Sequence, residues 1–426
     1  YLAEKGYKPV VFEKNERPGG MLTYGIPSFK LQKDVIEAEV KIIRLMGAEF
    51  RYGVEVGRDV TLDELRAQGF KAFYVAIGCQ GGRLAGIPGE DAEDVTVAVD
   101  FLREVNSGKI DALPGRTIVV GGGNVAIDVA RNACRLGSEH VEMFCLESEA
   151  QMPASEEERR EAVEDGAHIS CGWGPKEVHL DEAGRVCGIT FKRCTRVFDD
   201  EGRFAPEYDE NDLRRVDADR VVMSIGQSIV WGDLLAGSKV ELGRGQGALA
   251  DPQTYQTAEP DIFVGGDVYT GPSFAIDAIA AGHEAAVSIH RFVQPGSTLT
   301  IGRNQRRYTA LDRDDVVIEG YDNASREVAH VDREREKTAP FSEYVETFTE
   351  EQVRAETARC LGCGASIVDP NKCIGCGLCT TKCAFDAIHL DRDRPECSTM
   401  VKYEQKLPSL GKYALKRAIK IKFGRK

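Results

Sequence analysis

Four cysteines near the C-terminus stand at a regular spacing. Cys373, Cys376, Cys379 and Cys383 form the run C-x2-C-x2-C-x3-C. Four thiolates at this spacing suit a 4Fe–4S cluster, and the fourth cysteine of such a run usually serves the other cluster of a pair. The alternative, a zinc site, normally shows two separated C-x2–4-C pairs. The run therefore predicts an iron–sulfur site that carries single electrons.

Further cysteines flank this run: Cys360 and Cys363 precede it, and Cys397 follows it. The residues after Cys363 resemble those that follow the fourth cysteine of a ferredoxin run. By that likeness, Cys363 would join Cys373, Cys376 and Cys379 as the fourth ligand of one cluster. Cys360 and Cys383 could serve a second cluster, which lacks one ligand even with Cys397. One cluster is thus predicted and a second stays open. The predicted metal ligands are Cys360, Cys363, Cys373, Cys376, Cys379 and Cys383.

A glycine-rich turn follows a β-branched strand in the middle of the chain. Residues 116–120 read as the strand, and Gly121, Gly123 and Ala126 then form the pattern G-x-G-x-x-A. The glycines allow a tight turn and a close backbone approach to a pyrophosphate, and the alanine lets the next helix pack on the strand. That helix, residues 127–136, offers free N–H groups to phosphates. The context favours a dinucleotide site over an ordinary glycine turn.

An acidic residue follows the next predicted strand. Residues 141–144 read as that strand, and Glu147 lies 24 residues after Gly123, close to the roughly 20 expected of a ribose-binding acid. Its carboxylate can accept hydrogen bonds from ribose hydroxyls and would repel a 2′-phosphate. No arginine occurs between Arg135 and Arg159. Glu147 therefore favours NAD over NADP, unless it is a solvated loop acid.

Three features indicate a second nucleotide, a flavin. Glu13 ends the first strand of the chain, and the turn with Gly19 and Gly20 follows at once. Farther on, the strand 261–266 ends in two glycines before Asp267, ahead of a helix over residues 273–292. A helix N-terminus can face a pyrophosphate or the edge of a reduced flavin. Asp267 would accept a hydrogen bond from a ribityl hydroxyl.

Several long motifs occur in the same order in this chain as in a known family. Residues 1–293 resemble the small (beta) subunit of glutamate synthase and its relatives, which include the flavin subunit of ferredoxin-dependent NAD(P)H transhydrogenases and part of dihydropyrimidine dehydrogenase. The matching segments are residues 12–14, 18–22, 24–31, 76–78, 86–89, 121–128, 152–154 and 265–267. Members that take NADPH usually carry arginines just after the strand that ends here at Cys145-Leu146-Glu147, and this chain has none there.

The resemblance implies an α/β fold with two nested Rossmann-like, glutathione-reductase-like dinucleotide-binding domains and a small C-terminal ferredoxin-like α+β domain. It places FAD in the outer domain and the nicotinamide in the inserted one. The predicted cofactor-binding residues are Glu13, Gly19, Gly20, Met21, Gly78, Gly121, Gly123, Asn124, Val125, Ala126, Glu147, Gly226, Gly266, Asp267, Ser273 and Ala275. No side-chain acid or base is required, so no catalytic residue is predicted.

The motifs and the segments between them predict a series of domains along the chain. The expected domains are a first FAD-binding part (1–110), an inserted NAD(P)-binding domain (111–235), a return to the FAD domain (236–295), a linker (296–355), an iron–sulfur domain (356–398) and a basic tail (399–426). Because Tyr1–Gly6 reads as the end of a helix, the first strand of the FAD domain and its glycine turn are expected ahead of Tyr1.

The composition further limits the kind of protein that this chain can be. The net charge of −14 argues against a nucleic-acid partner, and no run of 18 apolar residues predicts a transmembrane segment. Thirteen cysteines, seven of them between Cys360 and Cys397, indicate metal binding in a reducing cytoplasm. The tail carries nine Lys or Arg residues against Glu404. It could dock an acidic partner such as a ferredoxin, form a basic amphipathic helix, or stay solvated.

Together these features predict an oxidoreductase subunit. A hydride would pass from NAD(P)H to FAD, and single electrons would pass through the cluster to a partner: a synthase, a reductase, a ferredoxin or a bifurcating complex. Two alternatives remain. The chain could be an electron-transfer or scaffold subunit without its own nicotinamide turnover, or it could be the NADPH-dependent small subunit of a glutamate synthase.

Overall fold

The computed structural model describes residues 1–301, 303, 324–360, 373–382, 388–390 and 402–423. The chain divides into two compact units, Tyr1–Val353 and Arg354–Lys426. The predicted metal ligands Cys363 and Cys383 lie outside the described residues, as does Cys397.

A five-stranded parallel sheet forms the centre of the first unit. Its order is β5 (Val95–Val97), β12 (Arg220–Met223), β6 (Arg116–Val120), β7 (His140–Cys145) and β8 (His168–Cys171). The helices α4 (Ala98–Asn106), α5 (Asn124–Arg135) and α6 (Glu156–Glu164) connect or cover these strands. The predicted parallel sheet is confirmed, and it already begins at Val95, ahead of the boundary expected at residue 111.

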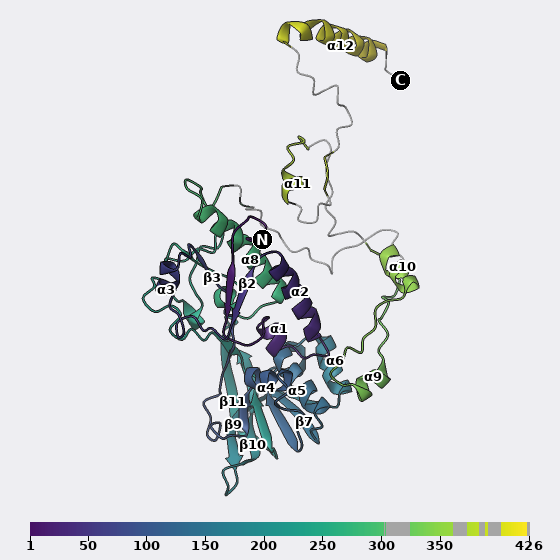
Figure 1. Ribbon diagram of the computed structural model, residues 1–426. Coiled ribbons are helices and arrows are strands. Elements are labelled where there is room, and N and C mark those ends of the chain that lie inside the picture. The colour runs from purple at the N-terminus through teal and green to yellow at the C-terminus, as the bar shows by residue number, and fades with distance from the viewer. Residues whose placement is uncertain (302, 304–323, 361–372, 383–387, 391–401, 424–426) are drawn as a thin grey trace. The chain divides into compact units, whose positions relative to one another are not determined.

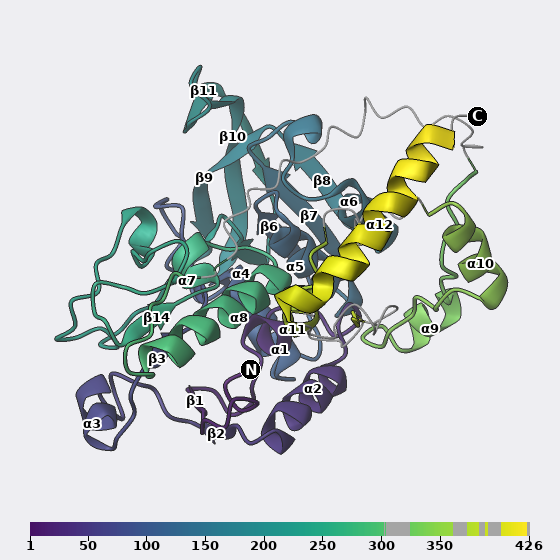
Figure 2. The same cartoon turned by 90° about the horizontal axis from the view of Figure 1, so that it is seen from above.

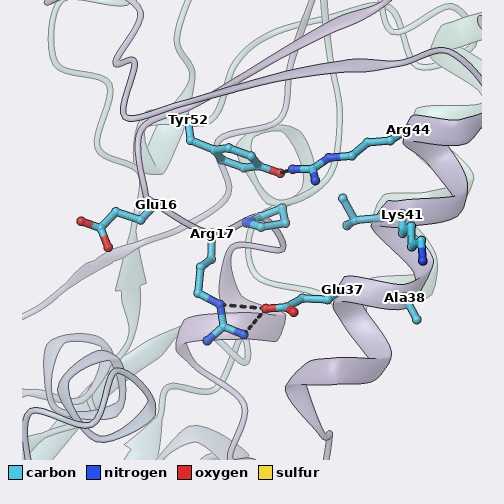
Figure 3. Close-up of a pocket in the computed structure, with 9 residues that line it drawn as sticks. Glu16, Arg17, Glu37, Ala38, Lys41, Arg44 and Tyr52 are labelled. Atoms are coloured by element: carbon cyan, nitrogen blue, oxygen red, sulfur yellow. Dashed lines mark hydrogen bonds and ion pairs between the residues drawn. The ribbon is translucent and has the colours of Figure 1, made fainter.

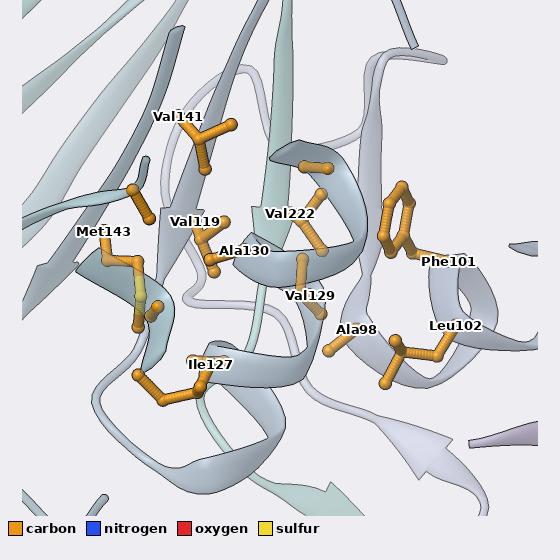
Figure 4. Packing of buried hydrophobic residues seen from close by; sticks show 14 of the residues in the cluster. Ala98, Phe101, Leu102, Val119, Ile127, Val129, Ala130, Val141, Met143 and Val222 are labelled. Carbon is orange, nitrogen blue, oxygen red and sulfur yellow. The ribbon is translucent and has the colours of Figure 1, made fainter. Parts of the chain in front are cut away.

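The main core lies between this sheet and α4 and α5. Val119, Ala130, Val141 and Val222 are buried there, and Figure 4 shows these side chains meeting from strands and helix. Strands covered on both faces need nearly continuous apolar runs, which is what Thr117 to Val120 supply. Packing of this kind fixes the ends of β6 and β7, where the glycine turn and Glu147 follow.

An antiparallel sheet extends the five-stranded sheet and its helices, which together are called the dinucleotide unit below. Its strands are β9 (Trp173–Leu180), β10 (Val186–Phe198) and β11 (Phe204–Val216), in the order β11-β10-β9. Figure 1 shows these long strands running together beside β7. The rings of Phe144 and Phe191 stack with centroids 3.9 Å apart and join the two sheets. The strand–helix alternation did not predict this sheet.

Three short strand pairs also belong to the first unit. β1 (Val10–Glu13) runs parallel to β2 (Glu49–Tyr52), β3 (Phe73–Val75) runs parallel to β14 (Ile262–Val264), and β4 (Gly81–Gly82) runs antiparallel to β13 (Gln227–Ser228). The strands predicted before Glu13, Gly78 and Gly265 are therefore present. Helices here are α1 (Met21–Tyr24), α2 (Lys33–Leu45), α3 (Leu62–Ala67), α7 (Asp267–Thr270) and α8 (Ala275–Phe292), the last of which Figure 2 shows along its length. Two 3-10 turns, η1 (Glu149–Gln151) and η2 (Arg244–Gln246), also belong to this unit.

The segment expected to be a linker packs on the dinucleotide unit in its described part. It contains α9 (Arg333–Thr338) and a bridge between Val331 and Val345. Tyr344 is only 6% exposed, and its hydroxyl accepts a hydrogen bond from Arg131 of α5 at 2.5 Å. Arg135 lies over the ring of the same tyrosine. The segment is therefore anchored by buried arginine–aromatic contacts, although its sequence is polar.

The helices near the C-terminus are α10 (Glu350–Ala358), α11 (Leu378–Lys382) and α12 (Tyr403–Phe423). The predicted ferredoxin-like fold of residues 356–398 lies largely outside the described residues. The basic amphipathic helix considered for the tail is present as α12, with Leu407, Leu410 and Ile421 exposed. In the described part of the chain, every helix is too short or too polar to span a lipid bilayer.

Candidate cofactor sites

The glycine turn lies between the end of β6 and the start of α5. A Cβ on Gly121 would lie 2.2 Å from the carbonyl oxygen of Ser224, and the residue has a φ of +143°, so glycine is required here. Gly123 precedes α5, and a Cβ there would meet open space. Asn124 and Val125 form the first turn of the helix, and Ala126 is fully buried. The turn leaves room for a pyrophosphate against the helix N-terminus.

Glu147 lies beside this turn. Its Oε2 would be 3.1 Å from a Cβ on Gly122, so the carboxylate borders the glycines. The backbone oxygen of Glu147 accepts a hydrogen bond from the N–H of Gly172 at 2.9 Å. The residue after β8 therefore fixes the loop after β7. The structure brings Glu147 and the glycine turn together, and the arrangement fits an adenosine ribose.

An arginine that the sequence pattern did not indicate lies at the same edge. The guanidinium carbon of Arg193 would be 3.2 Å from a Cβ on Gly172, and it lies 5.2 Å from the centroid of the Trp173 ring. Arg193 comes from β10 and reaches this position through the antiparallel sheet. The sequence just after β7 does not indicate Arg193, because no local spacing links this arginine to Glu147.

The first predicted flavin motif forms a tight turn into α1. Gly19 and Gly20 have φ of +104° and +52°, and a Cβ on Gly19 would lie 2.4 Å from Oγ1 of Thr23. The Thr23 hydroxyl donates to the carbonyl of Pro18 at 2.5 Å, and Met21 begins the helix. The two glycines leave the backbone of the turn without side chains, which is what a closely bound ring would require.

Three distant segments meet next to this turn. A Cβ on Gly20 would lie 3.5 Å from Nε2 of Gln80, which closely follows Gly78. The amide of Gln227, next to Gly226, donates to the carbonyl of Cys79 at 3.1 Å. The Cys79 thiol in turn lies 3.6 Å from the backbone oxygen of Asp267. The structure thus gathers the predicted Gly20, Gly78, Gly226 and Asp267.

Asp267 and the start of α8 form one side of this group. Gly266 has a φ of +68°, and burial raises the pKa of Asp267. The N–H of Ser273 donates to Oδ1 of Asp267 at 3.3 Å. Ala275 begins α8, and the nearby side chain of Phe274 is 74% exposed. Exposed apolar surface beside a partly buried acid fits a cofactor with both a ring and hydroxyl groups.

Glu13 is held at the end of β1. Its Oε1 accepts hydrogen bonds from the backbone N–H and the side-chain amide of Asn15, at 2.8 and 2.7 Å. Arg103 donates to Asn15 at 3.1 Å and to Gln80 at 2.9 Å, so Glu13 is connected to the Gly20 region through Asn15. A carboxylate oriented in this way suits a ribose diol.

A surface cavity of about 430 Å³ lies on the other side of the Pro18 turn. Figure 3 shows that an ion pair between Arg17 and Glu37 crosses it, and that Arg44 and Tyr52 meet at its rim. None of the predicted cofactor residues lines this cavity. The predicted flavin site therefore does not involve this cavity.

A partly buried ion cluster joins the segment after α1 to the helices α5 and α6. Lys30 follows the loop after α1, and its Nζ lies 2.6 Å from Oδ1 of Asp128 on α5 and also contacts Glu158 on α6. Burial raises the pKa of Asp128 to about 6, and Lys30 opposes that rise. The cluster fixes the turn that carries Gly20 relative to α5.

The described thiols of the predicted iron–sulfur site are exposed. They are Cys360, Cys373, Cys376 and Cys379. Among the residues that the structure describes, no three His, Cys, Asp or Glu side chains converge as metal ligands do. Soft thiolates fit iron–sulfur chemistry. The ligand set stays a prediction, because Cys363 and Cys383 lie outside the described residues.

Known structures share the fold of the first unit. Mycobacterium tuberculosis FprA in complex with NADPH matches with a TM-score of 0.57 and 19% identity, over 67% of this chain and 77% of that chain. Lactococcus lactis thioredoxin reductase matches with a TM-score of 0.52 and 18% identity, over 68% of this chain and 93% of that chain. These likenesses confirm the Rossmann-like oxidoreductase fold of the predicted α/β architecture.

Curated relatives are more similar in sequence. The NADP(+)-dependent formate dehydrogenase subunit beta of Moorella thermoacetica is 33% identical over 381 residues, which cover 85% of this chain and 52% of that protein. The glutamate synthase (NADPH) small chain of Escherichia coli is 33% identical, over 69% of this chain and 65% of that protein. The NAD-dependent dihydropyrimidine dehydrogenase subunit PreT of Escherichia coli is 32% identical, over 69% and 64%. The chain spans about half to two thirds of the length of these relatives.

Two family patterns match the chain itself. Residues 366–389 match the 4Fe-4S binding domain. Residues 1–282, which hold both glycine-lined edges, match the pyridine nucleotide-disulphide oxidoreductase family. The chain therefore belongs to the pyridine nucleotide-disulphide oxidoreductase family and carries a 4Fe-4S binding domain after it.

Proposed function

We propose that the chain oxidises a nicotinamide dinucleotide at a bound flavin and delivers single electrons through an iron–sulfur cluster to a partner protein. The observation that supports this most is the presence of two separate glycine-lined edges, around Gly20 and Gly123, within one compact unit. Bound FAD would supply the exchange between hydride and single-electron chemistry, and the cluster would relay the electrons. The protein's own residues bind and orient these groups.

Each predicted residue has a binding role in this proposal. Gly121 and Gly123 admit the pyrophosphate, and Glu147 accepts hydrogen bonds from the adenosine ribose. Gly19 and Gly20 expose backbone to the flavin, and Asp267 accepts a hydrogen bond from its ribityl chain. Met21, Gly78, Gly226, Gly266, Ser273 and Ala275 line the same edge. The proposal assigns no proton-transferring side chain.

We favour NAD over NADP because of Glu147, which would repel a 2′-phosphate. The neighbouring Arg193 supports the alternative, since a guanidinium binds phosphate well. The three relatives described above also differ in the dinucleotide for which they are named: two are named for NADP or NADPH and one for NAD. The preference for NAD or NADP should therefore depend on Glu147 and Arg193.

A basic face of α12 indicates the kind of partner protein that would accept the electrons. Lys412, Lys416 and Lys420 are exposed along one face of α12, since residues four apart are neighbours on a helix. Such a face would attract an acidic electron acceptor such as a ferredoxin. The names of the similar proteins include subunits of a formate dehydrogenase and a dihydropyrimidine dehydrogenase, which supports a role within a larger redox complex.

Cofactor content tests the proposal. Protein purified under anaerobic conditions should release FAD on denaturation and contain iron and acid-labile sulfide in equal amounts. Gly20→Ala should lower the flavin content and leave iron unchanged, with Gly69→Ala, another positive-φ glycine, as the matched control. Wild-type protein that keeps iron but takes up no added FAD would instead favour the scaffold alternative.

A further inference from the structure

Two thiols lie against each other beneath the dinucleotide turn. The Sγ of Cys145 is 3.7 Å from the Sγ of Cys171, and both thiols are free. The two residues end neighbouring parallel strands, where they are direct partners in the register of β7 and β8. Strands in a sheet lie about 4.8 Å apart, which falls in the Cα range of natural disulfides. The register and the short distance between the sulfurs therefore place the two thiols where a disulfide can form.

Cys145 also supports the dinucleotide site directly. A Cβ on Gly122 would lie 2.9 Å from the Cβ of Cys145 and 3.5 Å from its Sγ, so this thiol packs under the glycine turn. The same Sγ lies 3.7 Å from the backbone oxygen of Glu147. The neighbour of Cys171, Gly172, donates its N–H to that same oxygen. Cys145 itself and the residue after Cys171 thus contact the backbone that carries Glu147, whereas the Cys171 side chain contacts Cys145.

We propose that Cys145 and Cys171 form a reversible disulfide that weakens dinucleotide binding. The inference rests on the proposed function, because it concerns the site of Gly121 to Gly123 and Glu147. The oxidant is a small disulfide. Cys171 attacks one sulfur of that molecule and releases a thiol, and Cys145 then attacks the mixed disulfide and releases the second thiol. Two electrons and two protons pass from the cysteine pair to the oxidant.

The surroundings of the two thiols set this order of attack. Cys145 is 2% exposed, and burial, together with the nearby Cys171, raises the pKa of its thiol. Cys171 is only half-buried, so the small disulfide reaches it first. Cys145 is then the resolving thiol, already held at contact distance. Formation of the bond draws its sulfur toward Cys171 and away from Gly122 and the Glu147 carbonyl, which loosens the turn.

The test treats the holoprotein anaerobically with 2-hydroxyethyl disulfide and analyses it in two independent ways. Peptide mass analysis should find a Cys145–Cys171 cross-link that dithiothreitol removes. The Kd for NADH should rise about tenfold in the oxidised protein, the effect of losing one or two contacts, and recover on reduction. Cluster and flavin absorbance are followed in the same samples, so that damage to either is seen separately.

Variants separate the pair from other thiols. Cys171→Ser and Cys171→Ala should bind NADH like the reduced wild type and become insensitive to the oxidant. Cys187→Ser, which removes another half-buried thiol, should keep the full sensitivity. An unchanged NADH affinity in cross-linked protein would overturn the proposal, and so would a wild type without the cross-link. Failure of the reduced wild type to bind NADH would count against the proposed function instead, whatever the peptides show.

Discussion

Glu147 is the residue on which dinucleotide choice depends. Replacement by glutamine removes a charged acceptor of ribose hydrogen bonds, which costs about 1.5–3 kcal/mol. Glu147→Gln should therefore raise the KM for NADH at least about tenfold with little change in kcat. Glu149→Gln, two residues farther along in an exposed turn, is the matched control. Steady-state kinetics with both dinucleotides is the measurement.

The same series tests Arg193. Glu147→Arg should improve the use of NADPH, because a second guanidinium would then face the 2′-phosphate. Arg193→Ala should leave NADH kinetics unchanged and weaken any residual use of NADPH. A wild-type KM for NADH in Glu147→Gln would contradict the assigned role of this acid.

At this scale the sequence predicted residues that belong to local motifs. Gly121, Gly123 and Glu147 follow strand ends at known offsets, and the structure brings them together. Arg193 and the pairing of Cys145 with Cys171 could not be predicted in this way. They depend on the register of strands that are far apart in the chain.

Among the helices, α5 carries the largely buried carboxylate of Asp128, whose side chain is 13% exposed. Burial raises its pKa from 3.8 to about 6, against the effect of Lys30. Between these values the folded protein binds the proton more tightly than the unfolded chain. Stability therefore falls as pH rises through this window, by up to about 3 kcal/mol. Asp128→Asn should lack this decrease.

Urea denaturation followed by tryptophan fluorescence, just above pH 4 and just above pH 6, measures the difference. Asp100→Asn, an exposed acid at the start of α4, should behave like the wild type. Equal pH dependence in Asp128→Asn and the wild type would show that this carboxylate does not titrate in the window.

Tyr344 is a buried side chain that helps to hold the segment from Val331 to Val345 on the first unit. Tyr344→Phe removes the acceptor for Arg131, which is itself only 1% exposed. A lost hydrogen bond to a charged group costs about 2 kcal/mol, so the Tm should fall by several degrees. Tyr413→Phe on the exposed face of α12 should have no effect. An unchanged Tm for Tyr344→Phe would mean that the segment is not anchored here.

The sequence predicted the strands and helices of the nucleotide-binding units because their apolar runs are local. It did not predict the sheet of β9 to β11. In β11, residues such as Phe204 and Leu213 are exposed, so no regular apolar face marks the strand. The anchored segment was read as a linker because Arg131, Arg135 and Tyr344 pack through rings and guanidinium groups, which hydrophobic periodicity does not detect.

For the whole molecule, a substitution in the cysteine run should separate the reduction of a ferredoxin from the reduction of a quinone. Cys376→Ser should abolish reduction of a ferredoxin by NADH, because single electrons then lack their relay. Reduction of a two-electron quinone acceptor at the flavin should continue. Cys187→Ser is the control. Iron content and the cluster's visible absorbance are measured with both activities, and full ferredoxin reduction by cluster-free protein would rule out this relay.

The basic face of α12 should govern association with an acidic acceptor. Charge reversal at Lys412, Lys416 and Lys420 should lower kcat/KM for ferredoxin by about tenfold at low salt and reduce its dependence on ionic strength. Reduction of a neutral quinone should be unaffected. An unaltered salt dependence would show that the acceptor binds elsewhere.

The central claim is that one chain receives electrons from a nicotinamide dinucleotide and passes them from flavin to cluster. The most direct test is an anaerobic titration of the full-length protein with NADH and, separately, with NADPH, following flavin and cluster absorbance. We predict that NADH bleaches both chromophores and that NADPH has little effect. If neither dinucleotide reduces either chromophore in protein that contains both, the proposed electron path is wrong.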